Sequence, residues 1–238
     1  MIEINRFLDG LEELDNPEQL RSALGAQMSE YGLDFFAYHV VRPAAGPRQR
    51  FVVSNYPERW LEHYIDNDYI NVDAVLAAAV STNASISWRD LKPRLSPAQR
   101  QIFDEAGEFK IRQGITIPVH GHGGSLATLT VGSDQPDIVF DNVWREARHA
   151  LRLTAFHTHE AASRMAASGQ TGEAHLSPRE RECLLWAARG KSAWETGTII
   201  GTSERAVRFH FENVLNKLGV HSKIHAVVKA ILTGQIVP

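Results

Sequence analysis

Residues 176–218 read LSPRERECLLWAARGKSAWETGTIIGTSERAVRFHFENVLNKL, and this stretch decides how the chain is organised. The stretch predicts three consecutive helices, because each start carries a capping residue. Ser177 and Glu180 form one capping box, and Ser192 and Glu195 repeat the same S-x-x-E pattern. A glycine ends each predicted helix. These glycines are Gly190, Gly201 and Gly219.

The third predicted helix begins after Thr202 or Ser203 and has two unlike faces. Apolar residues recur at helical spacing on one face. They are Val207, Phe211, Val214, Leu215 and Leu218. The other face is polar and basic, with Arg205, Arg208, His210, Asn213, Asn216 and Lys217. A short helix, a glycine turn and a longer basic helix indicate a helix-turn-helix, whose second helix enters the major groove of DNA.

Composition limits the class of protein. The 238 residues suggest one or two domains, and 43% hydrophobic with 22% charged residues is ordinary for a globular protein. No apolar run reaches eighteen residues, so we expect no membrane span. The acidic N-terminus differs from a signal peptide, and the single cysteine, Cys183, cannot form an internal disulfide. These features predict a cytoplasmic location.

Charge is distributed unevenly along the chain. Residues 1–175 contain 16 Lys and Arg against 23 Asp and Glu, a net charge of −7, whereas residues 176–238 contain 9 against 5, a net charge of +4. An acidic part joined to a basic part is expected of a regulator with separate sensing and DNA-binding halves. A solvated lysine-rich face would give the same count.

The N-terminal part predicts an α+β fold, an α/β/α sandwich with a mostly antiparallel sheet of about five strands. The expected strands are 33–41, 48–55, 86–88, 114–119 and 125–131, with turns at 42–47 and 121–124. The expected helices are 3–14, 17–31, one from Pro57, one capped by Asp73, 96–110 and 137–164. We expect domains at 1–164 and 176–238, the second with four helices, and a linker of small polar residues at 165–175. The long helix 137–164 is a natural dimer element.

Several aromatic and acidic residues of the N-terminal part have two interpretations. Trp60 and Tyr64 are four apart, the spacing of a packing pair on a helix. Asp73 suits an N-cap, while Trp88 and Gly114 suit core filling and a turn. From spacing alone, these residues are explained by structure at least as well as by ligand binding.

The whole chain resembles LuxR-type quorum-sensing transcription regulators. In the C-terminal part the resemblance is carried by Glu180, Leu184, Trp186, Gly190, Lys191, Glu195, Ser203 to Val207, His210, Asn213, Lys217 and Leu218. In the N-terminal part, Trp60, Tyr64, Asp73, Trp88 and Gly114 lie where the family's autoinducer-binding domain has the same residues. The chain departs from the family at Gly197, where alanine is usual, and at Ala74, where proline is usual.

The resemblance implies that the ligand is an N-acyl-homoserine lactone. Trp60 would donate to the lactone carbonyl and Asp73 would accept from the amide N–H, while Tyr56 would donate to the acyl carbonyl. Trp88 would form an aromatic wall, and Thr130 would join the acyl carbonyl's network. The implied ligand-binding residues are Tyr56, Trp60, Tyr64, Asp73, Val75, Trp88, Thr116 and Thr130. Because Val75 is apolar, we expect a dry acyl side and, over a 3-oxo chain, a branched, aromatic or unsubstituted one.

The implied DNA-binding residues are Lys191, Ser203, Arg205, Arg208, His210, Asn213 and Lys217. The expected partners are an inverted-repeat DNA operator, the small-molecule autoinducer, a second copy of the chain and RNA polymerase. We expect no cofactor, no metal and no enzymatic activity, since no nucleophile motif such as G-x-S-x-G occurs. The pairs His120/His122 and His157/His159 are interpreted as solvated histidines. The alternative function is an orphan receptor of the same architecture that senses a non-lactone small molecule.

Overall fold

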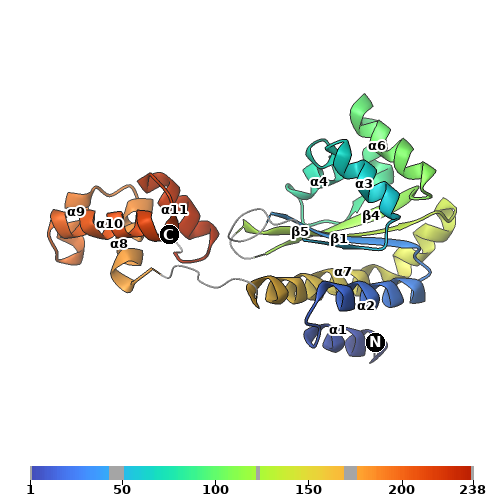
Figure 1. The fold of residues 1–238 in the computed structure, drawn as a ribbon, viewed down its shortest axis with the longest axis horizontal. Coiled ribbons are helices and arrows are strands. Elements are labelled where there is room, and N and C mark those ends of the chain that lie inside the picture. Colours follow the sequence, from blue (N-terminus) through green and yellow to red (C-terminus); the bar gives the residue numbers. More distant parts are fainter. Residues whose placement is uncertain (1, 43–50, 122–123, 169–175, 237–238) are drawn as a thin grey trace. The chain divides into compact units, whose positions relative to one another are not determined.

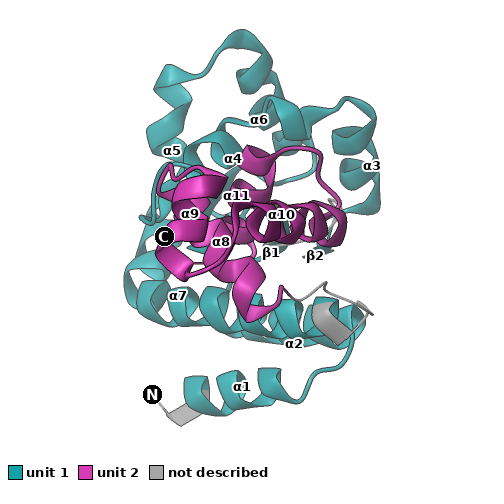
Figure 2. Cartoon of the chain, turned by 90° about the vertical axis from the view of Figure 1, so that its left-hand side faces the viewer, with its two compact units in different colours: residues 1–43, 48–120, 126–169 teal, residues 44–47, 121–125, 170–238 magenta. Residues whose placement is uncertain are grey.

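The computed structural model describes residues 2–42, 51–121, 124–168 and 176–236. The chain divides into two compact units (Figures 1 and 2). The larger comprises residues 1–43, 48–120 and 126–169, and the main part of the smaller is residues 170–238. Within the described residues no helix is long and apolar enough to cross a membrane.

A five-stranded sheet forms the centre of the N-terminal unit as described, in the order β2-β1-β5-β4-β3. Every neighbouring pair is antiparallel, as predicted. The strands are β1 (Phe35–Arg42), β2 (Val52–Ser54), β3 (Ile86–Ser87), β4 (Gln113–His120) and β5 (Leu126–Ser133).

Helices cover both faces of the sheet (Figure 1), which confirms the α/β/α sandwich. One face carries α1 (Ile2–Glu12), α2 (Pro17–Glu30) and α7 (Asp137–Ser168). The other carries α3 (Glu58–Asp66), α4 (Ala74–Ala79) and α6 (Pro97–Glu108). Shorter helices connect these elements, namely η1 (Tyr69–Asn71), α5 (Trp88–Leu91) and η2 (Lys92–Arg94).

The two sheet faces differ because strand residues alternate between them. On the face under α1, α2 and α7, the strands contribute Phe36, Tyr38, Leu129 and Val131, all fully buried in one continuous core. The opposite face contributes smaller and more polar side chains. A cavity therefore forms on that side.

Three expectations for this unit need correction or fall outside the described chain. Trp88 was expected in a strand, but it begins α5, directly after β3. The long helix α7 continues through Ser168, so the first residues of the expected linker are helical. The turn expected at 42–47 and the rest of the linker, 169–175, lie almost wholly outside the described residues.

The described part of the C-terminal unit contains four helices, as predicted: α8 (Pro178–Ala188), α9 (Ala193–Ile200), α10 (Glu204–Leu218) and α11 (Lys223–Leu232). Both predicted capping boxes are present, and Ser203 rather than Thr202 caps α10. The stripe of α10 packs against Leu184 and Ala226 in a separate core. Cys183 is buried there.

Gly197 is explained by the tight turn between α9 and α10. The Thr202 amide donates to the Gly197 carbonyl at 2.8 Å. A Cβ added at Gly197 would lie 2.8 Å from the carbonyl oxygen of Thr202. Glycine costs roughly 1 kcal/mol of helix propensity relative to alanine, but here it permits a closer approach of the turn than alanine would.

Candidate functional site: an enclosed cavity and a basic helix

A cavity of about 510 Å³ lies on the sheet face covered by α3, α4 and α6. Its size is typical of small-molecule sites. Seven of the eight predicted ligand-binding residues line it: Tyr56, Trp60, Tyr64, Asp73, Val75, Trp88 and Thr130. The eighth, Thr116, contacts two of these seven through hydrogen bonds. Residues far apart in the sequence therefore converge on one partly enclosed space.

Asp73 is the N-cap of α4, as its sequence position suggested, and it also lines the cavity. Its carboxylate caps α4 by accepting from the Val75 amide at 2.7 Å, and it accepts from the Tyr64 hydroxyl at 2.8 Å. Burial raises the pKa of Asp73 above its usual range, and these hydrogen bonds oppose that shift. A carboxylate has about four acceptor sites, so Asp73 keeps capacity for a further donor from the cavity.

Two tyrosines stand beside this carboxylate as neutral donors. Burial, and secondly the charge of Asp73, raises the pKa of both Tyr56 and Tyr64 well above the usual tyrosine range. Trp60 packs edge-on against Tyr64, with ring centroids 5.9 Å apart. The cluster therefore presents hydroxyl donors, an indole and one carboxylate within a largely apolar enclosure.

On the sheet side, Trp88 begins a short chain of hydrogen bonds. Its indole N–H donates to the Thr116 hydroxyl at 3.2 Å, and that hydroxyl lies 2.9 Å from the hydroxyl of Thr130. A hydroxyl has one proton and two acceptor lone pairs. Thr116 can therefore accept from Trp88 and donate to Thr130, which leaves the Thr130 proton for the cavity.

The side chain of Trp88 explains why residue 114 is a glycine. Gly114 lies within β4, not in the turn expected on structural grounds. A Cβ at this position would come within 2.7 Å of the indole ring. Glycine here allows the indole to lie flat against the sheet beside Thr116.

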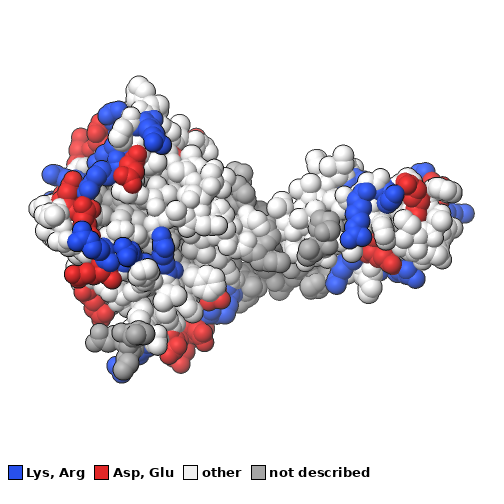
Figure 3. Space-filling view, turned by 180° about the vertical axis from the view of Figure 1, so that it is seen from behind, with Lys and Arg blue, Asp and Glu red and all other residues white. Residues whose placement is uncertain are grey.

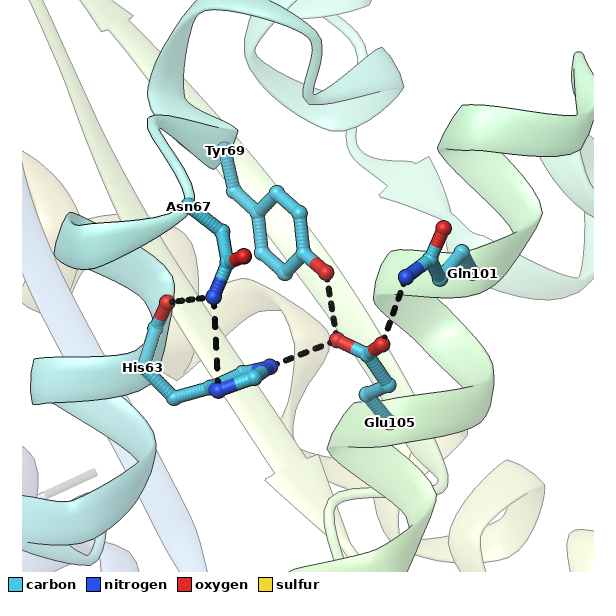
Figure 4. A network of polar contacts seen from close by, with 5 residues as sticks. All are labelled: His63, Asn67, Tyr69, Gln101 and Glu105. Atoms are coloured by element: carbon cyan, nitrogen blue, oxygen red, sulfur yellow. Dashed lines mark hydrogen bonds and ion pairs between the residues drawn. The ribbon is translucent and has the colours of Figure 1, made fainter.

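A polar network supports the cavity's helical cover (Figure 4). Glu105 on α6 accepts from the Tyr69 hydroxyl at 2.5 Å, from Gln101 at 2.7 Å and from His63 Nε2 at 2.7 Å. Asn67 donates to the His63 carbonyl at 2.8 Å and lies 3.3 Å from Nδ1. These contacts place the proton of neutral His63 on Nε2, toward the carboxylate. The hydrogen bond from Tyr69 is the main cause of the lowered pKa of Glu105.

This network connects α3 and η1 to α6 directly behind the cavity. The ring of Tyr69 contacts the ring of Tyr64, with centroids 5.8 Å apart. No sequence motif joins Glu105 and Tyr69, which are 36 positions apart, so neither residue could be predicted. Only the packing of α6 over η1 brings them together.

Three further polar residues on the cavity floor were also missed: His39, Ser54 and Thr128. The cavity lining therefore includes polar strand residues as well as the apolar Val75 of α4, and the expectation of a dry acyl side stays a prediction. The signal was available in the strands. Residues two apart share a face, so Thr128 had to accompany Thr130.

The predicted DNA-binding residues mostly lie on or beside α10. Arg205 and Arg208 are exposed in its first two turns, and His210 and Asn213 are partly exposed. Glu204 accepts two hydrogen bonds from the Arg208 guanidinium, at 2.6 and 3.0 Å. In Figure 3, Lys and Arg cluster over parts of the C-terminal unit, with fewer acidic atoms among them.

The other three predicted DNA-binding residues have structural contacts. Lys217 is bound to the buried Glu180 at 2.7 Å, which ties α10 to the capping box of α8. Ser203 uses its hydroxyl to cap α10, and Lys191 lies 3.4 Å from Glu195.

One histidine interpretation is wrong. His159 is not simply solvated, because its Nδ1 lies 2.8 Å from the hydroxyl of the fully buried Tyr38. His120 Nε2 contacts the Ala79 and Thr82 carbonyls. Among the described residues no group of three or more His, Cys, Asp or Glu is arranged to hold a metal ion.

A ligand-sized cavity in an α/β/α domain and a separate helix-turn-helix unit define a ligand-responsive DNA-binding protein. Comparison with known families agrees. Residues 16–162 match the model of the autoinducer binding domain, and residues 174–230 match that of the bacterial regulatory proteins of the luxR family. The chain belongs to the LuxR family of transcription regulators, and its domains are not those of an enzyme.

Individual relatives align over the whole chain. The transcriptional activator protein VanR of Vibrio anguillarum is 31% identical over 100% of this chain and 99% of its own. LuxR of Aliivibrio fischeri is 25% identical over 97% and 93%. The crystal structure of Escherichia coli SdiA matches with a TM-score of 0.77 at 23% identity, covering 99% and 98%. A structure of SdiA in complex with octanoyl-rac-glycerol matches with a TM-score of 0.75 at 22% identity, covering 97% and 93%.

The buried carboxylate makes a prediction about stability. The native state holds the Asp73 proton more tightly than the unfolded chain, because burial raises its pKa. The cost of the buried charge is thus absent below about pH 4, develops as the pH rises from there to the raised native pKa, and is complete above it. Asp73→Asn keeps an N-cap and should raise the ligand-free melting temperature at pH 7, with a smaller difference toward pH 4.

The measurement is thermal unfolding of both proteins without ligand from pH 4 to pH 8. The exposed Asp104 on α6 offers a matched control, Asp104→Asn, which should lack this pH-dependent gain. If Asp73→Asn melts below the parent protein at pH 7, the hydrogen bonds of the carboxylate outweigh its desolvation, and the prediction is wrong.

Proposed function

We propose that this chain is a quorum-sensing transcription regulator that binds an N-acyl-homoserine lactone in the cavity and palindromic promoter DNA as a homodimer in the cytoplasm. The observation that carries the proposal is the convergence of Trp60, Asp73 and Tyr56 on one enclosed space. Such a lactone has one amide donor and two carbonyl acceptors beside an apolar tail. Burying these polar groups without partners costs a few kcal/mol each.

Each polar group of the ligand has a counterpart in the cavity. The Asp73 carboxylate accepts from the ligand amide, and the Trp60 indole donates to the lactone carbonyl. Tyr56 and Thr130 donate to the acyl carbonyl, while Trp88, lying against Gly114, forms the wall beside the ring. Tyr64 orients Asp73 through their hydrogen bond.

A second candidate is a receptor of the same architecture for a non-lactone amphiphile. The same fold in SdiA has been described with octanoyl-rac-glycerol. The buried Asp73 favours the lactone for this chain, because its free acceptor capacity suits an amide N–H. Mass spectrometry of material extracted from the purified chain distinguishes the two ligands.

For DNA binding, we assign base contacts to Arg205 and Arg208 and a phosphate contact to Lys191. Both arginines are exposed at the start of α10, where recognition helices meet base edges. Lys217 contributes mainly to the fold through Glu180. A symmetric dimer requires an inverted-repeat operator. The long helix α7, with Leu153 and Phe156 about half exposed, is the proposed dimer element, and RNA polymerase is the further partner of an activator.

The lactone role of Trp60 is tested by Trp60→Phe. The variant keeps an aromatic ring but loses the indole donor, so lactone affinity should fall by roughly 1–3 kcal/mol, the cost of a lost buried hydrogen bond. A ligand that binds only the native state raises the melting temperature with concentration, so a titration with a panel of acyl-homoserine lactones measures the change. Trp144→Phe, on α7 across the sheet, is the matched control. Unchanged affinity in a folded Trp60→Phe would contradict the assigned contact.

The two kinds of DNA contact are separated by Arg208→Ala and Lys191→Ala. Loss of Arg208 should cost about 1–3 kcal/mol on the operator and relax discrimination at one base pair in each half-site. Loss of Lys191 should weaken all DNA alike and reduce the salt slope by roughly one. Each variant serves as the other's control in titrations on operator and scrambled DNA at two salt concentrations. An unchanged operator-to-scrambled ratio for Arg208→Ala would remove its base-contact role.

A further inference from the structure

The cavity floor consists of two rows of residues that cross the sheet. In the first row, Ser54 pairs with Ala37, which pairs with Thr130, which pairs with Thr116. This row includes Thr130, the proposed partner of the acyl carbonyl. It therefore marks where the acyl group begins.

The second row lies two residues further along the strands and contains Val52, His39 and Thr128. Residues two apart on a strand are separated by about 6.6 Å. That distance corresponds to roughly five bonds of an extended acyl chain. Directly opposed side chains in neighbouring strands are close enough to share one partner. His39 and Thr128 are opposed in this way and both line the cavity.

The polar groups of this floor are buried. Thr128 is 1% exposed and Ser54 is 9% exposed. Both residues line the cavity. Each hydroxyl can donate one hydrogen bond and accept two. The floor therefore suits an occupant with a hydrogen-bonding atom at this depth.

The helices that cover the sheet also contribute apolar side chains to the cavity lining, namely Leu61 and Ile65 of α3, Ile70 of η1 and Leu76 of α4. The occupant of this region thus meets hydrocarbon on one side and hydroxyl and imidazole groups on the other. An unsubstituted alkyl chain satisfies only the first of these surfaces.

The far end of the cavity is polar as well. It reaches Pro17, Glu18 and Arg21 at the start of α2, beside Val52 of the edge strand. The Arg21 guanidinium pairs with Glu18 at 3.3 Å, and both side chains are exposed. The tail therefore ends at a charged opening instead of an apolar plug.

We propose that the native ligand carries a hydrogen-bonding oxygen in the distal half of its acyl group, beyond the third carbon, and that Thr128 and His39 bind it. This proposal rests on the proposed lactone function and specifies its ligand class. A substituent at the third carbon lies beside the acyl carbonyl, in the first row, and does not reach the second row. The position of the oxygen, and not only its presence, is therefore specified.

The test compares four ligands with one head group and one chain length on the purified full chain. They are N-octanoyl-homoserine lactone and its derivatives with a hydroxyl on the third, fifth or seventh carbon. Calorimetric titration should give about tenfold tighter binding for the fifth- or seventh-carbon derivative than for the unsubstituted lactone, the effect of one good hydrogen bond. The third-carbon derivative should show no such gain.

Thr128→Val identifies the partner of the hydroxyl. This change removes the hydroxyl and should abolish the tenfold preference, measured as the ratio of the variant's own affinities for the hydroxylated and the unsubstituted lactone. Thr154→Val is the matched control, because Thr154 is also a fully buried threonine but lies on α7, outside the residues lining the cavity. It should keep the preference of the parent protein.

The outcomes are distinct. Equal binding of all four lactones, or a preference that survives Thr128→Val, would overturn the distal-oxygen proposal and leave the lactone function intact. A gain confined to the third-carbon derivative would also overturn it. No binding of any of the four, with a non-lactone compound recovered from the purified chain, would overturn the lactone function itself and the tail preference with it.

Discussion

The buried carboxylate of Asp73 is the interaction on which the ligand-binding unit depends. It caps α4 through the Val75 amide and holds α3 through the Tyr64 hydroxyl, so one side chain joins two elements of the cavity's cover. An isolated buried charge is costly, and the two hydrogen bonds offset this cost only in part, because burial still raises the pKa. Asp73 retains room for a further donor. In the proposed function the ligand amide supplies this donor, which would couple ligand binding to the packing of α3 on α4.

The cover of the cavity is held by polar contacts in addition to an apolar cluster that includes Trp60, Ile102 and Ala106. Glu105 accepts hydrogen bonds from Tyr69, His63 and Gln101. The ring of Tyr69 in turn contacts the ring of Tyr64. Charge-assisted hydrogen bonds are shorter and more directional than apolar contacts. They therefore position the cover precisely enough for the Tyr64–Asp73 bond without filling the cavity with side chains.

The sheet separates a packed face from a binding face by alternation alone. Odd and even positions of the same strands send Phe36 and Tyr38 into the core beneath α7, and Ala37 and His39 into the cavity. A register shift of one residue would exchange the packed face and the cavity face of a strand. The alternation therefore constrains the register of these strands. Substitutions at Thr128 or Ser54 therefore change the lining of the cavity and not the core on the other side of the sheet.

The sequence by itself determined most of the helices and strands, because these follow from local capping, alternation and spacing, and its resemblance to known regulators indicated the family. Ser177, Ser192 and Ser203 identified helix starts from their own neighbourhoods, and Trp60 and Asp73 were placed by their resemblance to a known domain. Only the tertiary structure decided that Trp88 turns into a helix and lies on Gly114, and that Lys217 binds Glu180. The same is true of the contact between Glu105 and Tyr69. The physical reason is that these contacts join residues far apart in the chain, and their geometry depends on how whole elements pack, which no local pattern records.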